Sequence, residues 1–120
     1  MIIGVDFDGT CVEHMYPAVG PDVPGAMDTL RKAVARGDQL ILWTMRSGQS
    51  LLEAQKWFQQ RGIPLFGSNR NPEQSSWTSS PKAYCQVYVD DAALGCPLKH
   101  PKGKRPYVDW DLVRVMLGIE

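Results

Sequence analysis

The sequence predicts an α/β fold, a three-layer sandwich in which a mostly parallel sheet carries helices on both faces. Short apolar runs of strand length alternate along the chain with longer segments whose apolar residues recur at helical spacing. Strands that alternate with helices are joined by right-handed crossovers, which make neighbouring strands parallel. The length of 120 residues predicts a single domain over residues 1–120, large enough to bury one core.

The first half of the chain contains two predicted strands and one helix. The apolar run at 2–5 has the unbroken character of a strand buried on both faces, and it ends at Asp6. Apolar residues at helical spacing predict a helix over about 25–36, which Gly37 can end. A second buried strand is expected at 39–44.

The second half of the chain holds a long polar segment at 67–81. This segment is rich in Ser, Asn and Pro and has little apolar periodicity, so we expect a long surface loop with a functional role. The elements expected around it are a helix over about 50–61, a weak strand at 63–66, a strand at 86–89 and a last helix over about 109–117.

The composition excludes several classes of protein. The 13 Lys and Arg residues balance the 13 Asp and Glu residues, which argues against a general nucleic-acid binder. No stretch approaches the roughly 18 to 20 uninterrupted apolar residues of a membrane span, and the N-terminus has no secretion signal, so we expect a cytoplasmic protein. The three cysteines, Cys11, Cys85 and Cys96, lack zinc-ligand spacing and are expected to be free thiols.

Polar side chains follow three of the predicted strands. Asp6 and Asp8 follow the first, Thr44 ends the second, and Asp90 with Asp91 follows the strand at 86–89. Because parallel strands end at one edge of the sheet, these side chains should converge there. Clustered carboxylates repel one another, and a cation bound by oxygen ligands, typically Mg²⁺, would offset that repulsion. The alternative for the pair after 86–89 is that both residues only form a turn.

The segment Asp6, Phe7, Asp8, Gly9, Thr10 (DFDGT) resembles the signature of the haloacid dehalogenase (HAD) superfamily of phosphatases. Further along the chain, Thr44, Lys82 and the pair Asp90 and Asp91 stand where the second, third and fourth motifs of that family fall. The resemblance runs over about residues 2–94. It implies a Rossmann-like catalytic core, and the short spacing between the motifs leaves no room for a separate cap domain.

The resemblance also implies roles for the first motif and the phosphate-binding groups. Asp6 would attack phosphorus and form an aspartyl-phosphate, and Asp8 would act as general acid and base. Gly9 would let the chain turn sharply beneath the phosphate. Thr44 and the backbone amide of Met45 would bind phosphoryl oxygens.

The metal ligands implied by the resemblance are the Asp6 carboxylate, the backbone carbonyl of Asp8 and a carboxylate of the fourth motif. Asp90 is the simplest choice for the last of these, with Asp91 either a second ligand or a support for the first. Lys82 would offset negative charge at the site. It lies closer to the fourth motif than is usual in the family, and Lys99 or the substrate-binding candidate Arg46 are the alternatives.

These observations predict a capless, Mg²⁺-dependent phosphate monoester hydrolase with an open site. Its substrate would be a phosphorylated small molecule or a phosphorylated polymer, and the sequence leaves a homo-oligomer open. A second hypothesis is a non-catalytic phosphate-ester-binding or scaffold protein that retains the metal site. A third is a polynucleotide end phosphatase, against which the lack of a basic surface argues.

Three further features have two readings each. His14 and Tyr16 belong either to a flap beside the site or to a plain surface loop. Trp77, in the polar loop, either stacks on a substrate or has no role there. The basic run at 99–105 either contacts phosphates or, as we favour from the zero net charge, is a solvated loop.

Overall fold

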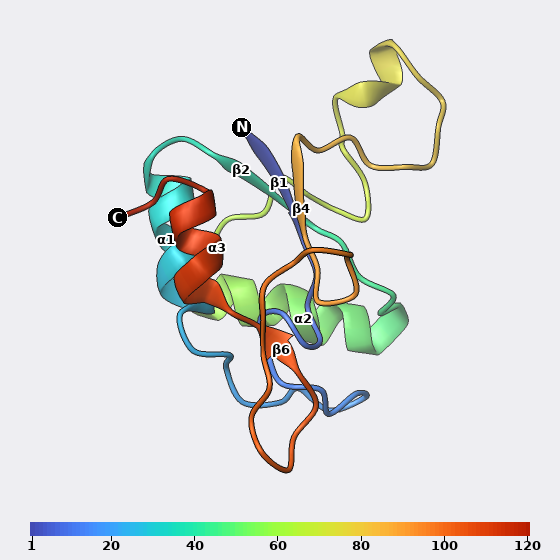
Figure 1. The fold of residues 1–120 in the computed structure, drawn as a ribbon. Helices are drawn as coiled ribbons and strands as arrows, with labels where there is room; N and C mark the ends of the chain where they lie inside the picture. The colour runs from blue at the N-terminus through green and yellow to red at the C-terminus, as the bar shows by residue number, and fades with distance from the viewer.

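A four-stranded parallel sheet in the order β3-β2-β1-β4 forms the centre of the computed structural model, which describes all 120 residues (Figure 1). The strands are β1 (Ile2–Val5), β2 (Gln39–Leu42), β3 (Gly67–Ser68) and β4 (Val87–Val89). The helices are α1 (Ala26–Ala35), α2 (Gly48–Gln60) and α3 (Trp110–Met116), with a short 3₁₀ helix η1 at Gln74–Ser76. The predicted α/β class, the parallel sheet and the absence of a cap domain are confirmed.

The central strands are apolar on both faces, as strands inside a parallel sheet must be. In β1 and β2 the paired residues include Ile3 with Leu40 and Gly4 with Ile41. Gly4 leaves room for the segment that covers its face, because a Cβ there would lie 2.9 Å from the Cys85 sulfur. A larger residue at this position would push that segment away from the sheet.

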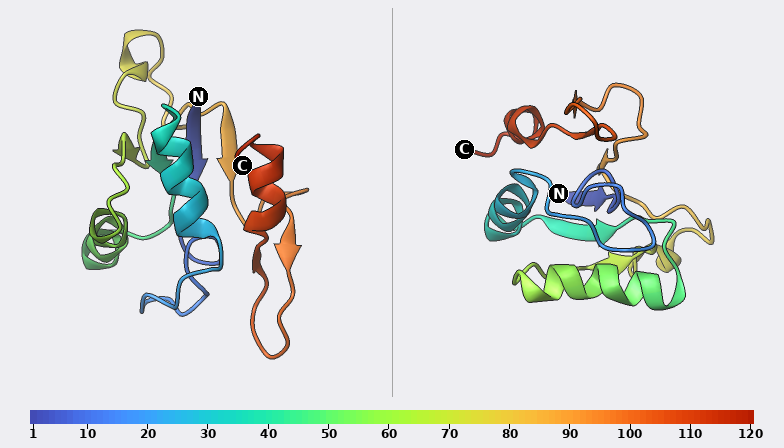
Figure 2. Two further views of the ribbon diagram at one scale, coloured as in Figure 1. Left: turned by 90° about the vertical axis from the view of Figure 1, so that its left-hand side faces the viewer. Right: turned by 90° about the horizontal axis from the view of Figure 1, so that it is seen from below.

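The helices and a long loop cover different faces of the sheet. Ile3 and Val5 point into the main core, which also holds the buried residues of all three helices. The opposite face packs on a smaller cluster formed by Ile41, Ala83 and Cys85. Figure 1 shows segment 69–86 on the far side of the strands from α1, and the left view of Figure 2 shows α1 in front of the strands, flanked by α2 and α3.

Crossover handedness explains this division. The chain steps from β1 to β2 to β3 in one direction, so right-handed crossovers place α1 and α2 on the same face. The return from β3 to β4 runs the other way and must cross the opposite face. That connection contains only η1 and irregular chain, so the predicted loop covers the second face, and the three helices pack on the first face where helices had been expected on both.

The other differences from the expected elements are small. The weak strand expected at 63–66 is found at Gly67–Ser68, immediately after that apolar run. Pro64 has no N–H to give to the sheet, and the first bond to β2 is the one from the Phe66 N–H to the Leu40 carbonyl, at 2.7 Å. The apolar run therefore leads into the strand, and Ile63 contributes a buried side chain to the core.

A second, two-stranded antiparallel sheet was not expected. It pairs β5 (Leu98–Lys99) with β6 (Tyr107–Val108), and the basic segment forms the connection between them. Two-residue strands are too short to show periodicity in the sequence. The ribbon leads into α3, whose first turn is capped by the Asp109 side chain. None of the helices is long and apolar enough to cross a membrane.

Candidate active site

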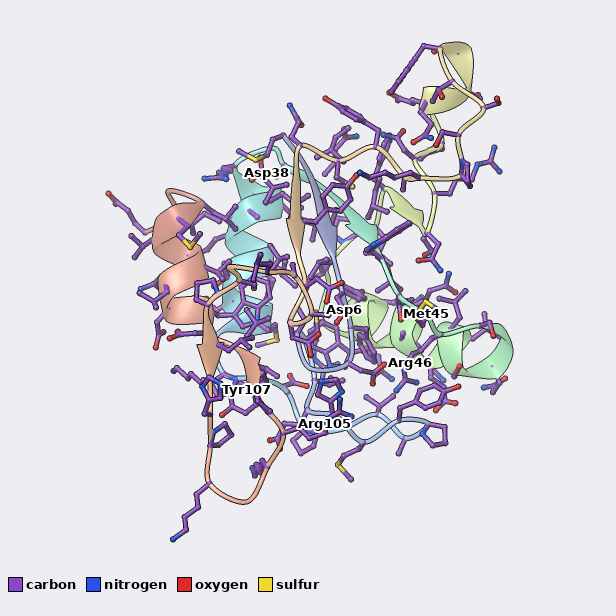
Figure 3. The ribbon with its side chains drawn as sticks, turned by 45° about the vertical axis from the view of Figure 1, so that its right-hand side comes forward. Asp6, Asp38, Met45, Arg46, Arg105 and Tyr107 are labelled. Atoms are coloured by element: carbon purple, nitrogen blue, oxygen red, sulfur yellow. The ribbon has the colours of Figure 1, made fainter.

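Three carboxylates converge where β1 and β4 end. Asp6 follows β1, and Asp90 and Asp91 follow β4, which is its neighbour in the sheet. The Asp6 N–H donates to the Val89 carbonyl at 2.9 Å, so the two strand ends are held together. One carboxylate oxygen from each of the three aspartates lies within 4.8 Å of the others. In Figure 3, Asp6 lies beyond the strand ends near Met45 and Arg46.

The electrostatics of this cluster oppose full ionisation. Burial, helped by a hydrogen bond to Asp91 and by the charges of Asp90 and Asp91, raises the pKa of Asp6 from 3.8 to about 8. The pKa of Asp90 is also raised, first by burial and then by Asp91, although the Ala92 N–H works the other way. Without a compensating cation, burial and mutual repulsion therefore oppose the simultaneous ionisation of the three carboxylates.

The donor set suits a hard divalent cation. All three side chains offer carboxylate oxygens, and neither a cysteine nor a histidine belongs to the group. Oxygen ligands of this kind are those that Mg²⁺ prefers, with water and substrate oxygens completing its shell. Asp6, Asp90 and Asp91 are thus the residues that could hold Mg²⁺, and such an ion would offset the repulsion just described.

Thr10 ties the two strand ends to each other. Its buried hydroxyl donates to the Asp6 carboxylate at 3.0 Å and accepts from the Asp91 N–H at 3.2 Å. Its carbonyl accepts from the indole N–H of Trp110 at 2.7 Å, a buried bond that anchors α3 beneath the motif. This side chain therefore orients two members of the cluster, a role that we did not assign from the sequence.

The segment after the DFDGT motif folds back onto the cluster. The His14 imidazole Nε2 and the Asp91 carboxylate lie 2.8 Å apart, and the His14 side chain is only 15% exposed. Gly9 has a φ of +82°, and a Cβ there would overlap both His14 and Asp91. Only glycine fits this position. His14 thus lies against the site, as the flap interpretation required.

Asp8 is held by a buried arginine. Its two carboxylate oxygens accept from Nε and Nη2 of Arg46, each at 2.8 Å. The Arg46 side chain is 1% exposed, and its guanidinium stacks between the rings of Phe7 and Tyr16, at 5.0 and 5.2 Å from their centroids. The hydrogen bond to Asp8 raises the pKa of Arg46 despite its burial.

The same guanidinium also fastens the flap segment and the start of α2. It donates to the backbone carbonyls of Pro17, Ala18 and Ser50, at 3.2, 2.8 and 3.3 Å. All five N–H groups of an arginine are thus directed at protein acceptors, so this side chain is committed to the fold. Arg46 was expected to bind substrate, and in the structure it instead binds Asp8.

A cavity of about 290 Å³ opens beside Asp6 and Asp90. Thr44 and Met45, which were predicted to bind phosphate, line it, and the Met45 side chain is almost fully exposed. Asn69 also lines it and was missed from the sequence. The Asn69 carboxamide oxygen accepts from the Thr44 N–H at 2.7 Å, and its φ of 54° is one that asparagine tolerates well. An asparagine within the polar loop is the sequence signal that could have pointed to this position.

The three candidate cations do not line this cavity. Lys82 is exposed, and its ammonium lies 5.5 Å from the centroid of the Tyr88 ring, although Pro81 beside it is part of the cavity wall. Lys99 pairs with Asp111 at 3.0 Å on the antiparallel ribbon. Together with Arg46, which faces Asp8, these positions mean that none of the three candidates pairs with a carboxylate of the cluster.

Comparison with known proteins gives one informative match. The chain is similar to the solved structure of a conserved protein from Bacteroides thetaiotaomicron, with a TM-score of 0.81 and 35% sequence identity over 98% of this chain and 89% of the other. This chain belongs to the family of that Bacteroides protein. The two proteins share the α/β fold over this matched length. No protein-family model and no curated protein matches the chain.

The polar loop contributes less to the Asp6 cavity than its composition suggested. Trp77 packs edge-on against Tyr84, with ring centroids 5.6 Å apart, and it does not line the cavity. The contribution of the loop comes instead from its two ends, Asn69 and Pro81.

Proposed function

We propose that this protein is a Mg²⁺-dependent phosphate monoester hydrolase of the HAD type that works through an aspartyl-phosphate on Asp6. The observation that supports this best is the convergence of Asp6, Asp90 and Asp91 at the strand ends, beside a cavity lined by Thr44. The DFDGT motif supplies Asp6 and its supporting Thr10 in one turn of chain.

In the proposed reaction, a carboxylate oxygen of Asp6 attacks phosphorus and the bond to the ester oxygen breaks. The alcohol leaves with one proton, and water then attacks the phosphorus of the acyl phosphate to release inorganic phosphate and restore Asp6. Thr44 and the Met45 amide would bind phosphoryl oxygens. Asp6, Asp90 and Asp91, with the backbone carbonyl of Asp8, would hold the Mg²⁺. When bound, that ion supplies charge neutralisation for the carboxylates and the phosphoryl group.

Asp8 would give the proton to the leaving oxygen and take one from the attacking water. Both of its oxygens are bound to Arg46, so turnover requires Asp8 to exchange at least one of these bonds for substrate. Because Arg46 also holds the carbonyls of Pro17 and Ala18, such an exchange would loosen the flap segment. The proposed cycle therefore includes a movement of that segment.

A second candidate function follows from the same ion pair. If Asp8 stays on Arg46, the site has no free general acid, and the protein would be a non-catalytic phosphate-ester-binding or scaffold protein with the metal site retained. The bidentate geometry and the burial of Arg46 favour this candidate more than the sequence did.

Release of inorganic phosphate from p-nitrophenyl phosphate tests the proposal. Activity should require Mg²⁺, disappear in EDTA and disappear in Asp6→Asn. Asp28→Asn is a matched control, because Asp28 is an exposed aspartate of α1 with only an i,i+4 partner, Lys32. Unchanged activity in Asp6→Asn would contradict the covalent mechanism. Tight binding of phosphate esters without turnover across a broad panel would support the second candidate.

The surroundings of the site support a small or flexible substrate better than a polynucleotide. Net charge is zero, and two lysines of the basic segment are already paired, Lys99 with Asp111 and Lys104 with Glu13 at 3.2 Å. We include a cytoplasmic location in the proposal, which is supported by the three free thiols.

A further inference from the structure

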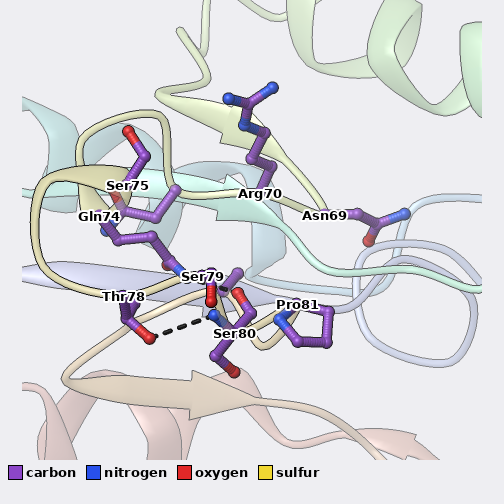
Figure 4. A pocket seen from close by; sticks show the side chains of 10 residues that line it. Asn69, Arg70, Gln74, Ser75, Thr78, Ser79, Ser80 and Pro81 are labelled. Carbon is purple, nitrogen blue, oxygen red and sulfur yellow. Dashed lines mark hydrogen bonds between the residues drawn. The ribbon is translucent and has the colours of Figure 1, made fainter.

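A second cavity adjoins the one beside Asp6. It has a volume of about 310 Å³, and the loop over 69–83 forms it (Figure 4). Asn69 and Pro81 belong to both cavities, so the two spaces share a wall. The second cavity is lined by amide and hydroxyl side chains and by one cation, Arg70, and its only hydrophobic residue is Ala83.

Hydrogen bonds within the loop hold this cavity in shape. The buried Gln74 carboxamide donates to the carbonyls of Ser80 and Lys82, at 3.1 and 2.9 Å, and accepts from the Tyr84 N–H at 2.7 Å. The Thr78 hydroxyl accepts from the Ser80 N–H at 3.1 Å. A ligand would meet a frame that is already ordered, which lowers the entropic cost of binding.

Several polar groups of the lining have no partner within the protein. The hydroxyls of Ser75 and Ser79 are exposed and make no hydrogen bond to the protein, and the exposed Arg70 guanidinium pairs with no carboxylate. The Asn69 oxygen is used by Thr44, but its NH₂ group is free, and this residue stands on the shared wall. The cavity thus offers neutral donors and acceptors plus one cation, with no carboxylate among its lining residues.

We propose that this second cavity binds the alcohol part of the substrate and that the substrate is a polyhydroxylated phosphate monoester, a sugar or polyol phosphate. This inference rests on the proposed function. With the phosphoryl group beside Asp6, the carbon chain would pass Asn69 and place its hydroxyls against Ser75 and Ser79. Ser75 and Ser79 are exposed and hydrated, so an alkyl group would displace their water without replacing its hydrogen bonds, which selects against it. Each cavity alone is at the small end for a ligand site, and the two together are well within the usual range.

Kinetic comparison of ribose 5-phosphate with butyl phosphate tests the substrate class. We expect kcat/KM to favour ribose 5-phosphate by at least about tenfold, mainly through KM. Ser79→Phe should remove this preference, because the ring fills the cavity. Ser76→Phe is the matched control: Ser76 is an exposed serine of η1 outside the lining, and its variant should keep the preference. If Ser79→Phe disturbs the fold by circular dichroism, Ser75→Phe repeats the test from another wall.

A binding measurement separates this inference from the proposed function. Ribose 5-phosphate added to the wild-type protein in EDTA should shift backbone amide resonances within 69–83, and butyl phosphate should leave them in place. Such shifts without turnover of any ester would uphold the binding site and reject the hydrolase. Equal turnover of both esters, with no shifts in 69–83 and no effect of Ser79→Phe, would overturn the binding site and leave the hydrolase standing.

Discussion

An aspartate shielded from solvent lies at each end of the sheet, and the protein shifts the pKa values of the two aspartates in opposite directions. Before β2, Asp38 is buried and accepts from the Met1 amino group at 2.8 Å and from the Arg36 Nε. Burial works against its charge, but these hydrogen bonds outweigh it and lower its pKa. After β1, Asp6 has two more carboxylates for neighbours, and its pKa is raised to about 8. Figure 3 shows the two residues at opposite ends.

The difference shows how a stabilising carboxylate can be told from a ligand-binding one. The charge of Asp38 is balanced within the protein, because a cation lies beside each of its two carboxylate oxygens. Asp6 lacks such partners, so the folded chain gains if a cation arrives from outside. The predictions below test this contrast between a carboxylate that is paired with protein cations and one that requires a cation from outside.

Exchanging each aspartate for asparagine should have opposite consequences. Asp6→Asn should lower kcat by about a thousandfold or more, since the nucleophile is lost, while stability at pH 8 without divalent cation should rise. Asp38→Asn should keep kcat within about twofold and lose about 1–3 kcal/mol of stability. Steady-state phosphate release and urea unfolding measure the two effects. A stability loss in Asp6→Asn as large as in Asp38→Asn would remove the contrast.

Arg46→Met should destabilise the protein by about 3–5 kcal/mol, because Asp8 would keep its charge without its buried partner. Urea denaturation measures this loss. The double variant with Asp8→Asn should recover part of it, since both members of the pair are then neutral. A double variant no more stable than Arg46→Met alone would show that Arg46 acts mainly through its bonds to the flap carbonyls.

Mg²⁺ should stabilise the wild-type protein by about 2.7 kcal/mol at a hundred times its dissociation constant. The gain should be larger at pH 8 than at pH 5, because protons compete with the metal for the carboxylates. Asp90→Asn should reduce the gain, and Asp28→Asn should not. Thermal unfolding with increasing MgCl₂ measures it. An equal shift in Asp90→Asn would place the ion elsewhere.

Without divalent cation, stability should fall as pH rises from about 4 to about 8. In this range the unfolded chain has lost the Asp6 proton, whose usual pKa is 3.8, and the folded chain still holds it up to about pH 8. Asp38 has the opposite sign: its lowered pKa gives stability above 3.8 that is lost as the pH falls further. Urea midpoints at pH 5 and pH 8 in EDTA should differ less in Asp6→Asn. An unchanged difference would show that Asp6 does not titrate as described.

Much of the fold could be predicted because it follows from periodic patterns. The helices were placed within about two residues of their bounds, since their apolar stripes extend over several turns. The long polar loop at 67–81 was predicted as well, but its position over the second face of the sheet was not. The strands at 98–99 and 107–108 could not be predicted either, because two-residue strands leave no period. The strand expected at 63–66 was displaced for a local reason, the missing N–H of Pro64.

The candidate site divides in the same way. The sequence was enough to predict the convergence of Asp6, Asp90 and Asp91, because parallel strands end at one edge of the sheet. The pairing of Asp8 with Arg46 and of Asp91 with His14 could not be predicted, because the partners are distant in sequence and no spacing rule links them. The contact of Asn69 with Thr44 could not be predicted for the same reason, because Asn69 lies in a loop whose path is set by the fold.

Trapping of the covalent intermediate tests the central claim most directly. Protein mixed with Mg²⁺ and substrate is quenched rapidly, reduced with borohydride and examined by peptide mass spectrometry, because borohydride converts an aspartyl-phosphate to homoserine. We expect homoserine at position 6, dependent on substrate and absent from Asp6→Asn. Turnover with no trapped residue, or with homoserine at position 8, 90 or 91, would contradict it.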